Sequence, residues 1–107
     1  MIDLKFEKKL EFLGGLSDKE LSMFAFAYNR LIDDLETDVI ASTPVKTGTL
    51  QRGFKIGGSF NKKTLVAKAY VKNNVRYAIY IDEVQFIATL PFLEFKFEVE
   101  SLVLEYL

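Results

Sequence analysis

Residues 17–41 have the sequence SDKELSMFAFAYNRLIDDLETDVIA, and they contain the main helix signal of the chain. It opens with Ser17-Asp18-Lys19-Glu20, the arrangement known as a capping box. In a capping box the serine hydroxyl and the glutamate carboxylate each accept a hydrogen bond from a backbone amide that the first helical turn leaves free. The sequence therefore predicts one long helix over residues 18–41.

One side of this predicted helix is apolar. Met23, Phe26 and Ala27 lie partly off that side, and two interpretations of them stay open: a wide core stripe, or contact with a neighbouring subunit. The residues of the stripe itself recur at spacings of three and four, the pattern of a helix face that packs on a core. They are Leu21, Phe24, Tyr28, Leu31, Ile32, Leu35 and Val39.

On both sides of the helix the pattern changes to the alternation of strands. Residues 2–13 alternate apolar and charged side chains up to Gly14-Gly15, which predicts a half-buried strand. Thr43-Pro44 ends the helix, since the residue before a proline avoids helical backbone angles. Beyond it, turn residues and alternation predict a strand, a hairpin loop, a strand and a turn at residues 50–56, 57–63, 64–72 and 73–74.

The C-terminal third is ambiguous on its own pattern. Residues 75–81 fit a short helix or a strand, and residues 93–100 alternate like a strand. The same region also contains a helical stripe, and Pro91 suits the first position of a helix. That stripe consists of Phe92, Phe95, Val99, Leu102, Val103 and Tyr106. We expect a single α+β domain over residues 1–107, with a small, mostly antiparallel sheet packed against the long helix.

Composition argues against several kinds of chemistry. The chain has no cysteine and no histidine, which removes thiol nucleophiles, disulfides, Cys/His zinc sites and the commonest general base near neutral pH. Fourteen Lys and Arg oppose fifteen Asp and Glu, so the basic excess of a general nucleic-acid binder is missing. No apolar run suits a membrane span, and the N-terminus lacks a secretion signal. We expect no catalysis, no cofactor, no metal and no membrane partner.

Carboxylates late in the helix have a spacing that suits a metal ion. Asp34 and Asp38 are four residues apart on one face, so Mg2+ could bridge them, as in a metal-dependent nuclease. The simpler interpretation is a solvated face on which Arg30 pairs with Asp34. The adjacent Asp82 and Glu83 point in different directions and make a poor acid–base pair. A surface or interface role is expected for both.

Segments after the long helix resemble a phage family. Thr43-Pro44-Val45-Lys46-Thr47-Gly48-Thr49-Leu50-Gln51-Arg52 directly follows the helix, and Asn74-Val75-Arg76-Tyr77-Ala78-Ile79-Tyr80-Ile81-Asp82 and Pro91-Phe92-Leu93 come later. Their order and distances are similar to those of the head–tail joining or tail-completion family, whose members are often called minor tail components. Lys46 stands where the family usually has Asp, and Glu83-Val84-Gln85 replaces the usual Phe-Gly-Thr.

The resemblance implies a fold with a C-terminal helix and a structural role in the virion. The implied function is a homo-oligomeric ring, expected to be a hexamer, at the head-proximal end of the tail. One side would cap the tail tube and the other would dock the head connector or stopper protein, with assembly in the host cytoplasm. Because a closed head-to-tail ring needs two different contact patches, we expect apolar patches at Met23 and Phe26 and over Tyr77 to Val84.

Further residues are interface candidates through the same resemblance: Thr43, Pro44, Thr47, Gly48, Arg52, Tyr80, Asp82 and Glu83. Gly57-Gly58 with Lys62-Lys63 lacks the spacing of a phosphate loop, which favours a hairpin tip with two solvated lysines. Such tips could face the lumen of a ring, where Lys62 and Lys63 would touch DNA in passing. Two other functions remain open: a small cytoplasmic binding or regulatory domain that shares the fold, and the metal-dependent nuclease.

Overall fold

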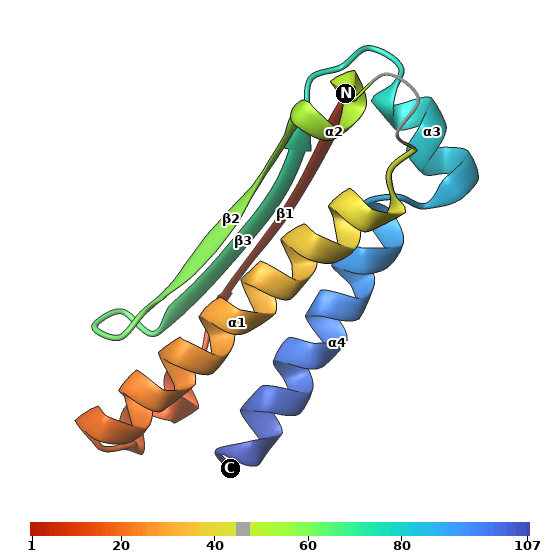
Figure 1. Cartoon of the computed structure of the whole chain (residues 1–107). Helices are drawn as coiled ribbons and strands as arrows, with labels where there is room; N and C mark the ends of the chain where they lie inside the picture. The colour runs from red at the N-terminus through yellow and green to blue at the C-terminus, as the bar shows by residue number, and fades with distance from the viewer. Residues whose placement is uncertain (45–47) are drawn as a thin grey trace.

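The computed structural model describes residues 1–44 and 48–107; Val45, Lys46, Thr47 and the side chain of Val84 lie outside the described residues. The interface prediction for Thr47 therefore falls outside this description. The molecule is elongated, with extents of 47 × 20 × 18 Å. Figure 1 shows two layers, a narrow sheet on one side and two long helices on the other.

Three strands and four helices follow one another along the described chain, with one 3-10 turn. They are β1 (Ile2–Lys9), η1 (Glu11–Gly15), α1 (Asp18–Ser42), α2 (Thr49–Arg52), β2 (Phe54–Asn61), β3 (Val66–Asn73), α3 (Ala78–Gln85) and α4 (Thr89–Glu105). The α+β class is confirmed, with a long central helix and a C-terminal helix. The C-terminal region is a helix, as its apolar stripe indicates, and not the strand that its alternation also allowed. The helix places Phe92, Phe95, Val99 and Leu102 in the core.

The sheet has the order β1-β3-β2, and both of its ladders are antiparallel. Residues of one parity face α1 and α4: Ala67, Ala69 and Val71 of the central strand β3 are buried beneath the helices. Residues of the other parity, such as Lys68 and Lys72, are exposed. The helices cover only one side of the sheet (Figure 1), and we call the uncovered side the open face.

Helix α1 begins with the predicted capping box. The amide of Glu20 donates to Ser17 Oγ and the amide of Ser17 donates to Glu20 Oε1, both at 3.2 Å. Its predicted stripe is the buried face, with Phe24, Tyr28, Ile32, Leu35 and Val39 all buried. The local signal and the tertiary packing therefore agree along the whole helix.

Aromatic rings join the two layers. Phe24 and Tyr28 of α1 are stacked, with centroids 6.5 Å apart, and Phe60 of β2 meets Phe24 edge-on at 4.9 Å. Phe95 of α4 lies 5.9 Å from Tyr28. The Tyr28 hydroxyl donates a 2.7 Å hydrogen bond to the carbonyl of Lys68, and burial raises the pKa of Tyr28 well above its usual value. Tyr28 thus contacts elements of both layers.

The predicted hairpin loop at residues 57–63 is wrong in extent. Gly57 and Gly58 lie inside β2, and the turn covers only 62–65. A Cβ at Gly58 would be 2.2 Å from the Lys68 carbonyl oxygen and 2.8 Å from Ile32 Cδ1. A glycine in a strand often marks such a close approach of other backbone. Gly58 therefore lets α1 lie close to the sheet.

Two other boundaries differ from the sequence prediction. The strand expected over 2–13 ends at Lys9, because the 3-10 turn that follows buries both Leu10 and Leu13, three residues apart. The strand expected over 50–56 starts at Phe54 instead. The short helix α2 precedes it and buries Leu50.

Candidate subunit interfaces

The end of α1 is fastened by side chains from the segment that follows it. Thr43 is buried, and its hydroxyl donates a 2.6 Å hydrogen bond to the carbonyl of Val39. The side-chain amide of Gln51 donates to the carbonyls of Ile40 and Thr43, at 3.3 and 3.4 Å. These bonds satisfy carbonyls that the last helical turn leaves free. Thr43 and Gln51 therefore hold the chain where it leaves α1, beside the half-buried Pro44.

Gly48 begins α2 with φ 69° and ψ −14°, in the left-handed region. A Cβ at this position would be 2.7 Å from Nη1 of Arg52, so the guanidinium group lies over the glycine. Both reasons favour glycine here, since only glycine enters this region without a steric penalty. The exposed Arg52 is kept close to the turn rather than extended into solvent.

A buried asparagine connects the same end of the molecule to β3. Asn73 Nδ2 donates to the carbonyl of Leu50 at 2.9 Å, and Asn73 Oδ1 accepts from the amide of Val75 at 2.9 Å. A Cβ on Gly53 would be 2.7 Å from Asn73 Oδ1. The resemblance pointed to the neighbouring Asn74, which is exposed. The sequence pattern alone does not distinguish Asn73 from Asn74. Asn73 is buried because β3 extends to it and its side chain continues the buried side of the alternation.

Asp82 is a buried anchor of α4. Its Oδ1 accepts hydrogen bonds from the amides of Ala88 and Thr89, at 2.8 and 2.9 Å, and its Oδ2 accepts from the Thr89 hydroxyl. These are amides at the start of α4, where a negative charge is favoured by the helix dipole. Glu83, next to it, is exposed. The interface prediction stays a prediction for both residues, but Asp82 has a structural role that sequence reasoning missed.

The turn between α3 and α4 contains a strained residue. Phe86 has φ 53° and ψ 40°, and its amide donates to the Asp82 carbonyl at 2.8 Å. The left-handed region costs a bulky residue about 1–2 kcal/mol. The Phe86 ring is 54% exposed, so it contributes little to the core. A strained residue with an exposed aromatic ring suggests that the ring serves another purpose.

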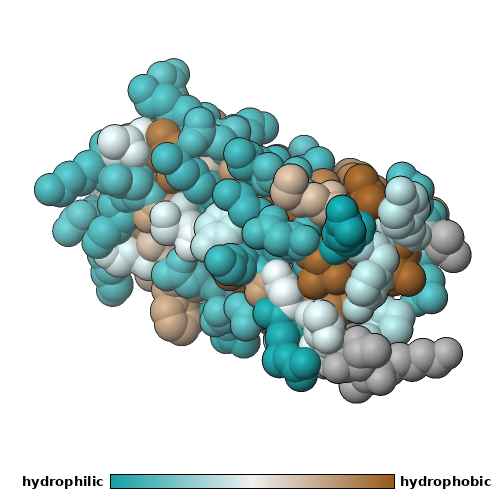
Figure 2. Space-filling view, turned by 90° about the horizontal axis from the view of Figure 1, so that it is seen from above, coloured by the Kyte–Doolittle hydropathy of each residue, from teal (hydrophilic) through white to brown (hydrophobic). Residues whose placement is uncertain are grey.

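Around this turn, one end of the molecule is apolar at its surface. Tyr77, Ile79, Tyr80 and Phe86 are all exposed there, Tyr80 by 66%. Figure 2 looks onto this end and shows apolar atoms gathered at the right of the view, on the side of α3, beside a largely hydrophilic surface. Exposed aromatic clusters of this kind are typical of protein–protein contacts. We call these four residues the α3-end patch.

The opposite end carries the other sequence-predicted residues. Met23 and Phe26 are 54% and 67% exposed on α1, so they lie outside the core. Lys62 in the hairpin turn donates a 3.1 Å hydrogen bond to Ser22 Oγ, which brings the hairpin tip next to this part of α1. Lys63 is exposed at the same tip. The predicted residues therefore fall into two groups at opposite ends of the long axis (Figure 1).

The carboxylates proposed for a metal lie on the outer side of the helix layer. Asp34 and Asp38 of α1 and the neighbouring Glu94 raise the pKa of Glu98 on α4, after its partial desolvation, so these acids share one region. The expected Arg30–Asp34 ion pair is not formed. In the described ranges no basic nitrogen lies within 4 Å of the Asp34 carboxylate. No group of three or more metal-ligating side chains with suitable geometry occurs among the residues described.

A long α+β subunit with separate apolar patches at its two ends is typical of a component of a larger assembly. The comparison with known families agrees with that class. The chain belongs to the HK97-gp10-like family, described as "Bacteriophage HK97-gp10, putative tail-component", whose family model matches residues 5–83. Searches of curated proteins and of solved structures found no match.

The matched region extends from β1 to α3 and includes the segment 43–52. Membership in a family of phage tail components associates the chain with the virion and with other virion proteins. Throughout the portion of the chain that the structure describes, no helix combines the length and apolarity of a transmembrane segment.

Proposed function

We propose that this chain is a tail-completion or head–tail joining subunit that forms a ring, expected to be hexameric, at the head-proximal end of a phage tail. The family match carries the proposal, because it covers most of β1, the whole of α1 and the Thr43–Arg52 segment. The protein would act by surface complementarity and without catalysis. Its action would be to stop growth of the tail tube on one side and to present a docking surface for the head connector on the other.

The distribution of exposed apolar residues supports this function. A subunit that joins two different neighbours along the tail axis needs two unlike contact surfaces. The α3-end patch, rich in aromatic rings, and the surface at Met23 and Phe26 lie at opposite ends of the 47 Å long axis. The first surface sits on a rigid base, since Asp82 and Asn73 fix its elements by buried hydrogen bonds.

Electron microscopy of particles assembled without this protein tests the proposal. Overlong, headless tails would identify a terminator, and tails of normal length that fail to join heads would identify a joining protein. Normal infectious particles would contradict both. The purified chain should also form closed rings that bind tail tubes. A stable monomer without affinity for tubes would instead favour a small binding or regulatory domain.

The nuclease alternative is tested separately with Asp34→Asn and Asp38→Asn combined. These two carboxylates are exposed, and among the described residues they belong to no group of three or more side chains that could hold a metal ion. The double variant is expected to fold as the wild type does, and neither protein is expected to cleave DNA in the presence of Mg2+. Mg2+-dependent DNA cleavage by the wild type that disappears in the double variant would overturn the structural function.

A further inference from the structure

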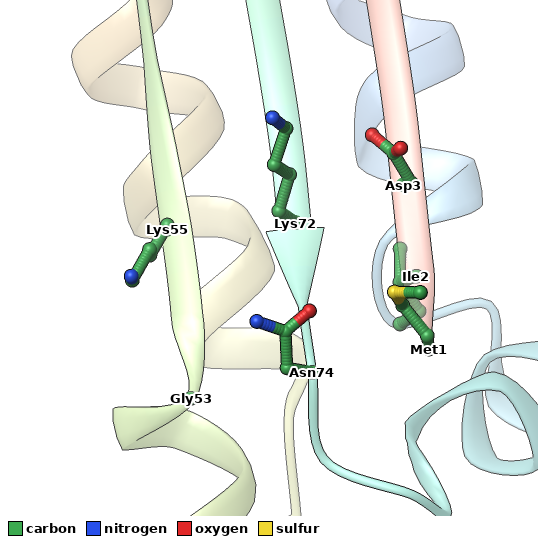
Figure 3. A pocket seen from close by; sticks show the side chains of 7 residues that line it. All are labelled: Met1, Ile2, Asp3, Gly53, Lys55, Lys72 and Asn74. Carbon is green, nitrogen blue, oxygen red and sulfur yellow. The ribbon is translucent and has the colours of Figure 1, made fainter.

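The open face of the sheet is rich in lysine. Its cross-strand rows place Asp3 beside Lys72 and Lys72 beside Lys55, then Lys5 beside Tyr70, then Glu7 beside Lys68. Figure 3 shows Lys55, Lys72 and Asp3 projecting from three neighbouring strands at the α2 end of this face. In the described ranges no carboxylate lies within 4 Å of Lys55 or Lys72. Like charges opposite each other in a sheet are unfavourable. The pair has no carboxylate partner within that distance in the described ranges, and Lys72 Nζ lies 5.5 Å from the centroid of the Tyr70 ring.

The helix layer has the opposite charge. Helices α1 and α4 contain ten acidic residues against Lys19, Arg30 and Lys96. Strands β1 to β3 with their hairpin contain eight lysines against Asp3 and Glu7. The net charge of −1 for the whole chain hides this separation. None of the described acids of α1 or α4 has a basic nitrogen within 4 Å.

Helix α4 also carries a second apolar face. Its first face, with Phe92, Phe95, Val99 and Leu102, packs on the core. Leu90, Leu93, Phe97 and Leu104 recur at helical spacing on the opposite side and are 43–66% exposed. This outer stripe runs beside the acidic region that Glu94 and Glu98 form with Asp34. An exposed apolar stripe flanked by charge is the usual composition of a protein interface.

We infer that the lysine-rich open face of one subunit docks against the acidic outer face of the α1–α4 layer of a second copy of this chain. Charge complementarity selects this occupant, since Lys55 and Lys72 would meet Asp34 and Glu98, while Tyr70 and Val66 would cover Phe97 and Leu93. The contact joins two different surfaces, so it repeats from copy to copy, and with a rotation that closes it gives the ring of the proposed function. It replaces the patches at the two ends, which the sequence analysis assigned to the ring contact, and leaves those ends free for other virion proteins. The inference rests on the proposed ring function and names its lateral contacts.

Charge reversal tests the contact. One variant combines Lys55→Glu with Lys72→Glu, and a second combines Asp34→Lys with Glu98→Lys. Each alone places like charges opposite each other at the reversed positions, and its self-association is expected to weaken at least about tenfold, because like-charge juxtaposition across an interface is costly. A 1:1 mixture of the two variants presents complementary faces again and is expected to assemble. The variant with all four substitutions should assemble alone.

A matched control reverses Arg76 and Glu83, which are exposed beside and within α3, away from both faces. Arg76→Glu with Glu83→Arg is expected to assemble as the wild type does. Analytical ultracentrifugation measures association in each case. Raising the salt from about 0.1 M to about 1 M shortens the electrostatic screening length from about 10 Å to about 3 Å. The self-association of the wild type should weaken over the same range of salt.

The outcomes separate this inference from the proposed function. Wild-type rings whose stability is indifferent to all of these reversals overturn the inference and leave the ring function intact. A wild type that stays monomeric at millimolar concentration and ignores tail tubes overturns both. The open face would be a DNA surface instead if the Lys55→Glu, Lys72→Glu variant kept its rings but lost binding to a short DNA duplex at low salt.

Discussion

Gly58 of β2 lies directly under Ile32 of α1, and a Cβ at position 58 would come within 2.8 Å of Ile32 Cδ1. The same Cβ would come still closer to the backbone oxygen of Lys68, which cannot move without disturbing the central strand. The distance between the long helix and the sheet is thus fixed by the absence of one methyl group.

Gly58→Ala is therefore expected to lower the free energy of unfolding by about 2–3 kcal/mol, the upper part of the range for an overpacked core. For a chain of this size that corresponds to a fall in melting temperature of roughly 10–20 °C. Gly15→Ala is the matched control, since a Cβ there meets nothing within 4 Å. Thermal unfolding that shows the same melting temperature for both variants would contradict the packing argument.

Asp82→Ala is expected to destabilise the isolated chain by about 1–3 kcal/mol, because two amides at the start of α4 lose their acceptor. Asp82→Asn keeps one side-chain oxygen and should lose less. Glu83→Ala changes the exposed neighbouring carboxylate and should be close to neutral. Chemical denaturation measures all three. Equal stability of Asp82→Ala and wild type would mean that the carboxylate serves only an interface.

Phe86→Asn is expected to leave the chain as stable as the wild type, or more stable by up to about 1 kcal/mol. Asparagine tolerates the left-handed backbone that Phe86 adopts, and the exposed ring gives up little burial. If the ring belongs to a docking surface, the same variant should bind tail or connector proteins more weakly. A large loss of stability would show instead that the Phe86 ring supports the fold.

Glu98→Gln is expected to raise the melting temperature near pH 7. Desolvation and the charges of Asp34, Asp38 and Glu94 raise the pKa of Glu98 in the folded chain. Its ionised form is thus less favourable in the folded state than in the unfolded state. The stabilising contribution of protonated Glu98 is complete below its unfolded pKa and is lost as pH rises through the folded pKa.

The gain from Glu98→Gln should accordingly be present at neutral pH and disappear in acid, below the ordinary pKa of a glutamate. Melting temperatures of both proteins from about pH 3 to pH 7 provide the measurement. Glu20→Gln would be unsuitable as a control, because Glu20 caps α1. Glu105→Gln, at an exposed carboxylate at the end of α4, is the better control. A gain in melting temperature from Glu98→Gln that is equal at all pH values would contradict this explanation.

Local signals explain why much of the fold could be predicted. The capping box and the stripe from Leu21 to Val39 describe α1 completely, since its cap and its packing are both encoded within one segment. The stripe of α4 competed with strand alternation, because Leu93 and Phe97 supply apolar residues on the exposed side as well. Apolar residues on the outer face of a helix weaken the periodic spacing of apolar residues by which a helix is recognised in a sequence.

The parts that the sequence did not reveal depend on contacts between distant segments. The sequence pattern predicts a loop at Gly57 and Gly58, whereas the approach of α1 requires the second glycine within a strand. The sequence predicts a surface role for Asp82. Its partners, the amides of Ala88 and Thr89, come near the carboxylate only because the chain reverses direction after α3. The separation of charge between the two layers was invisible to a count of charges, since it arises only when the sheet and the helices face opposite ways.

The position of β3 at the centre of the sheet has a consequence for biosynthesis. β1 is synthesised well before β3, yet in the described sheet β1 pairs with β3, which ends at Asn73. At typical translation rates of about 5–20 residues per second, the first strand waits roughly 3–13 s for that partner to be made. During this time Ile2, Leu4 and Phe6 have no sheet to join, and the charged residues between them are the chain's protection against premature pairing with another nascent copy.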